Sequence, residues 1–135
     1  MGEIAEYMVA PGLRDKFNEY GFNFSKTGRN TEVSDRYNKI FFEIDIFLEN
    51  YEKAMLVEVK TNLTEKNIEA HIERMEKMRK YADLHNDKRS FLGAVAGVVI
   101  PKNIKDLALN SGFYVIEPSG ETFSITSPHG KPKEW

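Results

Sequence analysis

Residues 40–61, with the sequence IFFEIDIFLENYEKAMLVEVKT, decide the fold that we predict for this chain. Apolar and acidic residues alternate in its first half, so Phe42, Ile44 and Ile46 are expected on one face of a strand and Glu43 and Asp45 on the other. Residues 54–61 alternate as well, and residues 50–53 are expected to form the turn between the two strands. The stretch therefore predicts an antiparallel hairpin with acidic side chains on its polar face.

The segments that follow the hairpin predict alternating helices and strands. Residues 64–84 form the clearest helix, because Thr64 is a suitable N-cap and apolar residues recur at helical spacing. The almost continuous apolar run 91–100 indicates a strand buried on both faces, which is typical of parallel pairing. Three shorter segments complete this half of the chain: a helix at 102–110, a strand at 113–117 and an edge strand at 122–126.

The segments before the hairpin are less regular. Residues 2–20 predict a helix that Pro11 and Gly12 interrupt, and residues 22–39 predict a short strand followed by a loop. Together the elements predict an α/β fold in which helices pack on a mixed central sheet. We expect one domain over residues 1–126 and a loose C-terminal tail over residues 127–135.

The composition limits which classes of protein are possible. A chain of 135 residues with 41% hydrophobic residues suits one domain with its own core. The absence of cysteine excludes disulfides and thiolate metal sites, but it leaves sites in which carboxylates hold a hard cation. The net charge of -2 provides no general attraction to nucleic acid. No apolar run is long enough to cross a membrane and the acidic N-terminus lacks the form of a signal peptide, so we expect a cytoplasmic protein.

The polar faces of the hairpin bring together residues suited to one kind of chemistry. Glu58 and Lys60 are two apart on their strand and therefore project from the same face, about 6.6 Å apart. Asp45 is expected beside Glu58 on the neighbouring strand, with Cβ atoms roughly 4.5–5.5 Å apart. Two carboxylates that close repel each other, and a divalent cation between them removes the repulsion. With Lys60 next to a bound phosphate, the arrangement suits metal-dependent hydrolysis of a phosphodiester.

Ile44-Asp45 and Glu58-Val59-Lys60, on adjacent strands before a long helix, resemble the motif of the PD-(D/E)XK nuclease superfamily. The chain is most similar to the small, uncharacterised prokaryotic domains of this kind, over residues 2–117. The resemblance implies a restriction-endonuclease-like αβββαβ core that acts on nucleic acid, with DNA favoured, and uses Mg²⁺ or Mn²⁺. It also implies that Asp45, Glu58 and the Val59 backbone carbonyl bind the metal, and that Lys60 is the catalytic lysine. Ile44 replaces the proline of the family motif, a position that takes no part in the chemistry.

Three further residues are candidates for supporting roles. The resemblance implies an acidic residue from the first helix, for which Glu6 is preferred to Glu3. Glu43 is expected to be a neighbouring charge rather than a metal ligand. His71 lies on the apolar side of the long helix, and it is interpreted either as a core residue or as a group that reaches the site.

Other interpretations of the same residues stay open from the sequence. The hairpin could belong to an unrelated α/β domain, with Asp45 facing solvent and Glu58 and Lys60 forming an exposed pair worth under about 1 kcal/mol. The nuclease fold could also serve as a catalytically inactive module for nucleic-acid binding or protein assembly, which the acidic net charge favours. An active enzyme of this size has little room for a separate sequence-reading module. We therefore expect it to read nucleic-acid structure, to form a homodimer or to depend on a protein partner.

Overall fold

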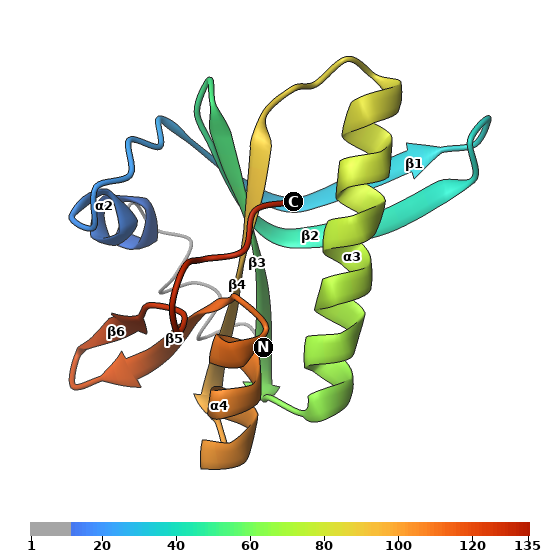
Figure 1. The fold of residues 1–135 in the computed structure, drawn as a ribbon. Helices are drawn as coiled ribbons and strands as arrows, with labels where there is room; N and C mark the ends of the chain where they lie inside the picture. The colour runs from blue at the N-terminus through green and yellow to red at the C-terminus, as the bar shows by residue number, and fades with distance from the viewer. Residues whose placement is uncertain (1–11) are drawn as a thin grey trace.

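The structure, a computed structural model, describes residues 12–135, so the predicted supporting residues Glu3 and Glu6 lie outside the described residues. Figure 1 shows how the elements are arranged. In chain order they are α2 (Gly12–Asn18), β1 (Lys26–Asp35), β2 (Ile40–Glu49), β3 (Lys53–Asn62), α3 (Glu65–Leu84), β4 (Ser90–Val99), α4 (Lys102–Asn110), β5 (Tyr114–Ser119) and β6 (Thr122–Thr126). In this part of the chain, no helix is long and apolar enough to cross a membrane.

The six strands of residues 12–135 form one sheet, and their order across the sheet is their order along the chain. β3 pairs in parallel with β4, and β4 pairs in parallel with β5, while the other neighbours are antiparallel. A parallel neighbour requires a crossover, which α3 provides between β3 and β4 and α4 provides between β4 and β5. The α/β class and the mixed sheet predicted from the sequence are therefore confirmed.

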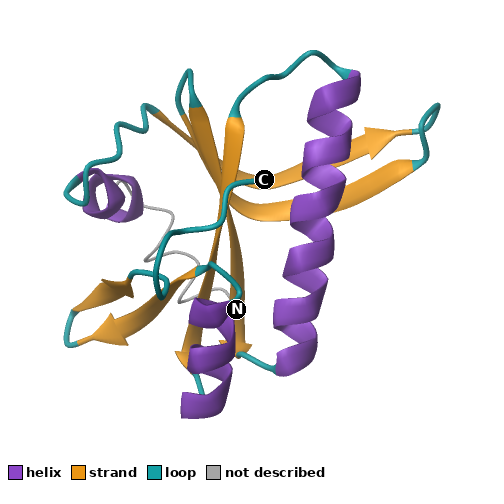
Figure 2. Cartoon of the chain, in the orientation of Figure 1, coloured by secondary structure: helices purple, strands orange, loops and turns teal. Residues whose placement is uncertain are grey.

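Helices cover both faces of the sheet (Figure 2). On one face α2 packs Leu13 and Phe17 into a core that includes Val57 of β3. On the other face α3 and α4 pack into a second core that includes Leu56. Successive residues of β3 therefore enter different cores, as the alternation in the sequence predicts. β4 is buried on both faces from Phe91 to Gly97, which confirms the interpretation of the apolar run.

α3 begins directly after β3 and has the predicted cap. The Thr64 side chain accepts a hydrogen bond from the Asn67 N–H, and the Asn67 side chain accepts one from the Thr64 N–H. The helix ends at the C-cap His85, as predicted. His71 is fully buried on the sheet side of this helix, whereas Ile72 is only partly buried.

The segment over residues 22–39 is mostly strand, which corrects the predicted loop. β1 has ten residues and pairs with almost the whole of β2, from Lys26 opposite Glu49 to Asp35 opposite Ile40. It lies at the edge of the sheet, and Val33 is its one buried residue. The prediction was wrong because pairing with β2, rather than an apolar alternation of its own, makes this segment a strand.

β2 changes face at Asp45, which corrects a second prediction. Ile44 and Ile46 are both buried, but Ile44 belongs to the core beneath α3 and Ile46 to the core beneath α2. On β1, Asn30 lies opposite this point and has a φ of 47°, a left-handed conformation that asparagine tolerates. The prediction assumed that the strand is uniformly pleated. The pleat is interrupted here, so the two isoleucines do not share a face.

The C-terminal tail, predicted to be loose, is fastened to the sheet. Trp135 exchanges two backbone hydrogen bonds with Phe91 of β4, with N···O distances of 2.8 and 3.0 Å. The Trp135 ring stacks on Phe113 with centroids 5.6 Å apart. The attachment of the tail could not be predicted from the sequence, because one pair of backbone hydrogen bonds and one ring contact leave no periodic pattern.

We predict that Trp135→Ala lowers the free energy of unfolding by about 1–2 kcal/mol, because the substitution removes the ring stack on Phe113. Urea denaturation monitored by circular dichroism measures the change. Lys131→Ala is the matched control, since Lys131 is an exposed residue of the same tail and its removal should leave stability unchanged. Equal stability of the Trp135→Ala variant and the original protein would mean that the tail contact contributes nothing.

Candidate active site

The predicted site lies where β2 separates from β3. Their antiparallel pairing runs from Glu49 opposite Ala54 to Ile46 opposite Val57 and then stops. Beyond that point, the Asp45 side chain takes the place of the β2 backbone: Asp45 Oδ2 accepts a hydrogen bond of 2.8 Å from the Val59 N–H.

The Val59 carbonyl faces the same side of β3 as the Val59 N–H. Both groups of a strand residue point toward the same neighbouring strand, as the paired exchange of hydrogen bonds in an antiparallel ladder shows. Since the Val59 N–H is directed at Asp45, the carbonyl is directed into the gap that β2 leaves. A backbone oxygen therefore lies next to the Asp45 carboxylate.

Glu58 is a buried acid with two ionisable neighbours, the carboxyl group of Asp45 and the guanidinium group of Arg74. It is 6% exposed and lies on the face of β3 that α3 covers. Its Oε2 lies 3.2 Å from Nη2 of Arg74 on α3. Burial raises the pKa of Glu58 to about 7, a hydrogen bond with the Asp45 carboxyl adds to the rise, and the positive charge of Arg74 opposes it.

Asp45 and Glu58 therefore lie together, as predicted. The geometry fits neither an Asp45 that faces solvent away from Glu58 nor an exposed pair of Glu58 with Lys60. A hydrogen bond between the two carboxyls requires them to converge, whereas the unrelated-hairpin interpretation expects them to point apart. Glu58 is also too buried to form an ordinary exposed pair with Lys60. A carboxyl pair beside a buried strand is the kind of group that gains from a bound cation.

His71 joins the site indirectly, through Arg74. It is fully buried, and burial together with the charge of Arg74 lowers the pKa of His71 to about 3, so its ring is neutral at neutral pH. Its Nε2 lies 3.0 Å from the Leu56 carbonyl oxygen and its Nδ1 lies 2.8 Å from Arg74 Nη1. A carbonyl only accepts and a guanidinium only donates, so the proton is on Nε2 and Nδ1 is the acceptor.

Arg74 is the site residue that the sequence analysis missed. Charged residues on a helix usually face solvent, so the residue type alone does not indicate a place in the site. The available signal was its position three residues after His71, because residues at that spacing lie on the same face of a helix.

Lys60 lies near Glu58, whereas Glu43 is exposed on β2. Lys60 is partly exposed two residues beyond Glu58, and its positive charge opposes the rise of the Glu58 pKa. Glu43 is exposed on β2, directly opposite Glu32 of β1, and no hydrogen bond connects it with Asp45 or Glu58 among the described residues. The arrangement thus favours Lys60 and not Glu43 as a participant.

The donor atoms fit a hard cation that keeps part of its water. Asp45, Glu58 and the Val59 carbonyl supply oxygen donors, the type of ligand that Mg²⁺ and Mn²⁺ prefer, and Mg²⁺ commonly takes one or two carboxylates together with water and substrate phosphate. Within residues 12–135 there is no cluster of three or more histidine, cysteine or acidic side chains that could hold a metal ion. Within the described residues, the ligands that the site offers are therefore Asp45, Glu58 and the Val59 carbonyl.

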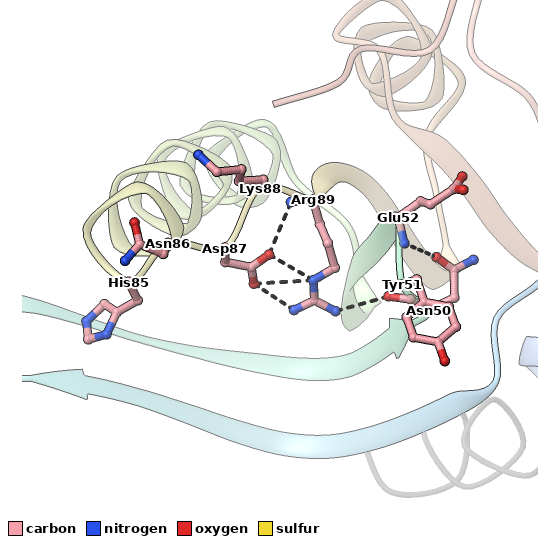
Figure 3. A pocket seen from close by; sticks show the side chains of 8 residues that line it. All are labelled: Asn50, Tyr51, Glu52, His85, Asn86, Asp87, Lys88 and Arg89. Carbon is pink, nitrogen blue, oxygen red and sulfur yellow. Dashed lines mark hydrogen bonds and ion pairs between the residues drawn. The ribbon is translucent and has the colours of Figure 1, made fainter.

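A separate open pocket lies at the far end of α3 (Figure 3). It has a volume of about 760 Å³ and is lined by Asn50, Tyr51, Glu52, His85, Asn86, Asp87, Lys88 and Arg89. Arg89 is held between Asp87 and Glu49, at 2.8 and 3.0 Å. These pairs join the end of α3 to the start of β4 and the end of β2, which indicates a structural role for the charges in this pocket.

Comparisons with known proteins give information on the fold alone. Neither the protein-family models nor the curated proteins compared with the chain gave a match. A crystal structure of AF1548, a protein of unknown function, is similar with a TM-score of 0.54 and 20% sequence identity. The similarity covers 82% of this chain and 58% of that one, so this chain spans little more than half the length of its structural neighbour.

We predict that the proton on Glu58 contributes to the free energy of unfolding and that this contribution is lost as the pH rises from about 4.5 to about 7. His71, whose pKa is lowered from 6.5 to about 3, contributes in the opposite direction up to about pH 6.5, so the Glu58 contribution is the difference between the original protein and a variant without the acid. The folded state raises the Glu58 pKa from 4.5 to about 7, so it binds the proton more tightly than the unfolded chain does. The stabilisation from this proton is complete below pH 4.5 and is lost as the pH passes through 7. Urea denaturation at a series of pH values measures it.

Glu58→Gln should remove the Glu58 contribution, because the amide does not titrate, so the free energy of unfolding of this variant should rise more steeply between about pH 4.5 and 6.5 than that of the original protein. Glu43→Gln is the control, since it removes an exposed acid of the same hairpin and should leave the dependence in place. An unchanged pH profile in Glu58→Gln would show that another group is responsible.

Proposed function

We propose that this protein is a nuclease that uses Mg²⁺ or Mn²⁺ to hydrolyse phosphodiester bonds of nucleic acid, with DNA as the favoured substrate. The observation that carries the proposal is the convergence of Asp45 and the buried Glu58 where β2 separates from β3. Lys60 lies two residues further along the same strand and supplies a positive charge near that point.

The order of the elements supports a restriction-endonuclease-like core. Helix α2, strands β1 to β3, helix α3 and strand β4 follow one another in the αβββαβ order that the resemblance to the PD-(D/E)XK superfamily implies. Asp45 and Glu58 lie on the second and third strands, which is where the motif places its acids. The likeness to AF1548 adds no information about activity, because that protein is itself of unknown function.

The chain's own residues would divide the work of hydrolysis. A divalent cation bound at this site would polarise the phosphoryl oxygen and lower the pKa of a bound water. Asp45 is held in place by the Val59 N–H, and Glu58 is held in place by the packing of β3 against α3. Lys60 would orient the attacking water and offset the negative charge that develops on the phosphoryl oxygens.

We predict that Asp45→Asn weakens Mn²⁺ binding at least about tenfold and abolishes metal-dependent cleavage, because it removes a charged oxygen ligand. Asparagine keeps an acceptor for the Val59 N–H, so the fold should be preserved. Calorimetric titration with Mn²⁺ measures binding, and nicking of supercoiled DNA together with cleavage of branched DNA measures activity. Glu43→Gln is the matched control and should leave both properties unchanged.

We predict that Lys60→Met lowers the cleavage rate about 100-fold or more while Mn²⁺ binding stays within about threefold of the original. The lysine acts on the reacting phosphate and not on the metal, so the two measurements should separate. Full activity of Lys60→Met would refute the role assigned to this residue. Cleavage that continues in Asp45→Asn would refute the assignment of the whole site.

One observation favours a second candidate, a catalytically inactive module for nucleic-acid binding or protein assembly. The ion pair between Arg74 and Glu58 already supplies a counter-charge to the buried acid without a metal. This alternative expects no Mn²⁺ binding and no metal-dependent cleavage, so the same titration separates the two candidates. A cytoplasmic location and a homodimer or protein partner stay predictions from the sequence.

A further inference from the structure

Arg74 contacts two buried polar groups of different character. Within residues 12–135, the polar or charged side chains that are buried are Glu58 and His71. The Arg74 guanidinium binds both of them, with Nη2 3.2 Å from Glu58 Oε2 and Nη1 2.8 Å from His71 Nδ1. One arginine therefore connects the acid of the proposed site with a neutral ring on the same helix.

The contact with His71 does not depend on the charge state of Glu58. The histidine ring is fixed by its hydrogen bond to the Leu56 carbonyl and by Phe113, whose ring centroid lies 5.0 Å away. With its proton on Nε2, the ring presents a lone pair to Arg74 as a permanent acceptor. If Glu58 changed partner, Arg74 would still be held at one end of its guanidinium.

The contact with Glu58 does conflict with metal binding. A cation that takes an oxygen of Glu58 brings two positive charges close to Arg74, and at a few ångströms such charges repel strongly in a partly buried site. Arg74 and the metal therefore compete for the same carboxylate. If a divalent cation held that oxygen, Nη2 of Arg74 would lose its anionic partner.

An anionic partner that the proposed reaction supplies at this place is the phosphodiester itself. The Arg74 side chain is 18% exposed, so the freed end of the guanidinium has access to a ligand in the site. A planar guanidinium also matches the oxygens of a phosphate in geometry as well as charge.

Building on the nuclease proposed above, we propose that Arg74 changes partner during the reaction: it neutralises Glu58 while the metal is absent, and it binds a phosphodiester oxygen once the metal has taken Glu58. His71 is the positioning residue that holds Arg74 through this exchange. The exchange makes Arg74 an opponent of the metal and a ligand of the substrate, so its removal should change the two affinities in opposite directions.

The first test is calorimetric titration of Arg74→Gln with Mn²⁺ alone. Mn²⁺ should bind about tenfold more tightly than to the original protein, because the competing charge is gone. Lys77→Gln is the matched control, since it removes one positive charge from an exposed position of the same helix and should leave Mn²⁺ affinity unchanged.

The second test measures DNA binding with Ca²⁺ in place of Mn²⁺, to separate binding from cleavage. The probe is a fluorescein-labelled Y-shaped DNA with single- and double-stranded arms, followed by anisotropy. Arg74→Gln should bind it about tenfold more weakly, because a charge-assisted contact to phosphate is lost. Lys77→Gln should bind it as the original protein does.

Arg74→Lys is a second variant that separates loss of the guanidinium from a folding defect as the cause of the changed affinities. Lysine keeps the counter-charge for Glu58 but lacks the fork that reaches both His71 and a phosphate. Its Mn²⁺ affinity should therefore stay within about threefold of the original, while its DNA affinity falls about tenfold. Thermal denaturation establishes that each variant is folded.

Each pattern of results decides the proposal. Tighter Mn²⁺ binding together with weaker DNA binding in Arg74→Gln supports the exchange. Weakening of both affinities would assign Arg74 a structural role, and unchanged Mn²⁺ affinity would show that it does not compete; either result overturns the proposal. If the original protein binds no Mn²⁺, the nuclease function itself fails, whereas Mn²⁺ binding that Asp45→Asn removes but Arg74→Gln leaves unaltered refutes the exchange alone.

Discussion

The burial of β3 on both faces is the constraint on which the rest of the structure depends. Residues 54–59 are buried without interruption, between the core beneath α2 and the core beneath α3. A carboxyl group in such a strand must find a partner or stay protonated, because an isolated charge is costly to bury. In this chain, Arg74 and Asp45 are the partners of the buried Glu58.

Much of the fold could be predicted because the sequence carries clear periodic signals. The alternation on either side of the turn at residues 50–53 identified the β2–β3 hairpin, and the capped apolar stripe of α3 and the continuous apolar run of β4 identified the crossover. The position of the turn also placed Asp45 beside Glu58 across the hairpin, although the alternation itself fails in β2 at Asp45. These predictions succeeded where one face or both faces of an element are buried, since burial is what imposes a pattern on the sequence.

The parts that could not be predicted depend on contacts between distant segments. β1 is a strand because β2 offers it a partner, and the tail is ordered because Trp135 meets Phe91 and Phe113. Arg74 belongs to the site because α3 crosses β3 at the depth of Glu58, a relation that no local pattern records. The change of face in β2 was missed for a related reason, since it coincides with the left-handed conformation of Asn30 on the neighbouring strand.

The hydrogen bond from the Val59 N–H gives the Asp45 side chain a structural role in addition to its proposed role as a metal ligand. It ends the β2–β3 ladder by satisfying a backbone N–H that would otherwise lack a partner. In a saturation-mutagenesis experiment that scores only cellular abundance, substitutions of Asp45 by apolar residues should therefore be depleted, while substitutions of the partly exposed Lys60 are retained. Purifying selection on this aspartate would accordingly persist in descendants of the protein that had lost every trace of activity.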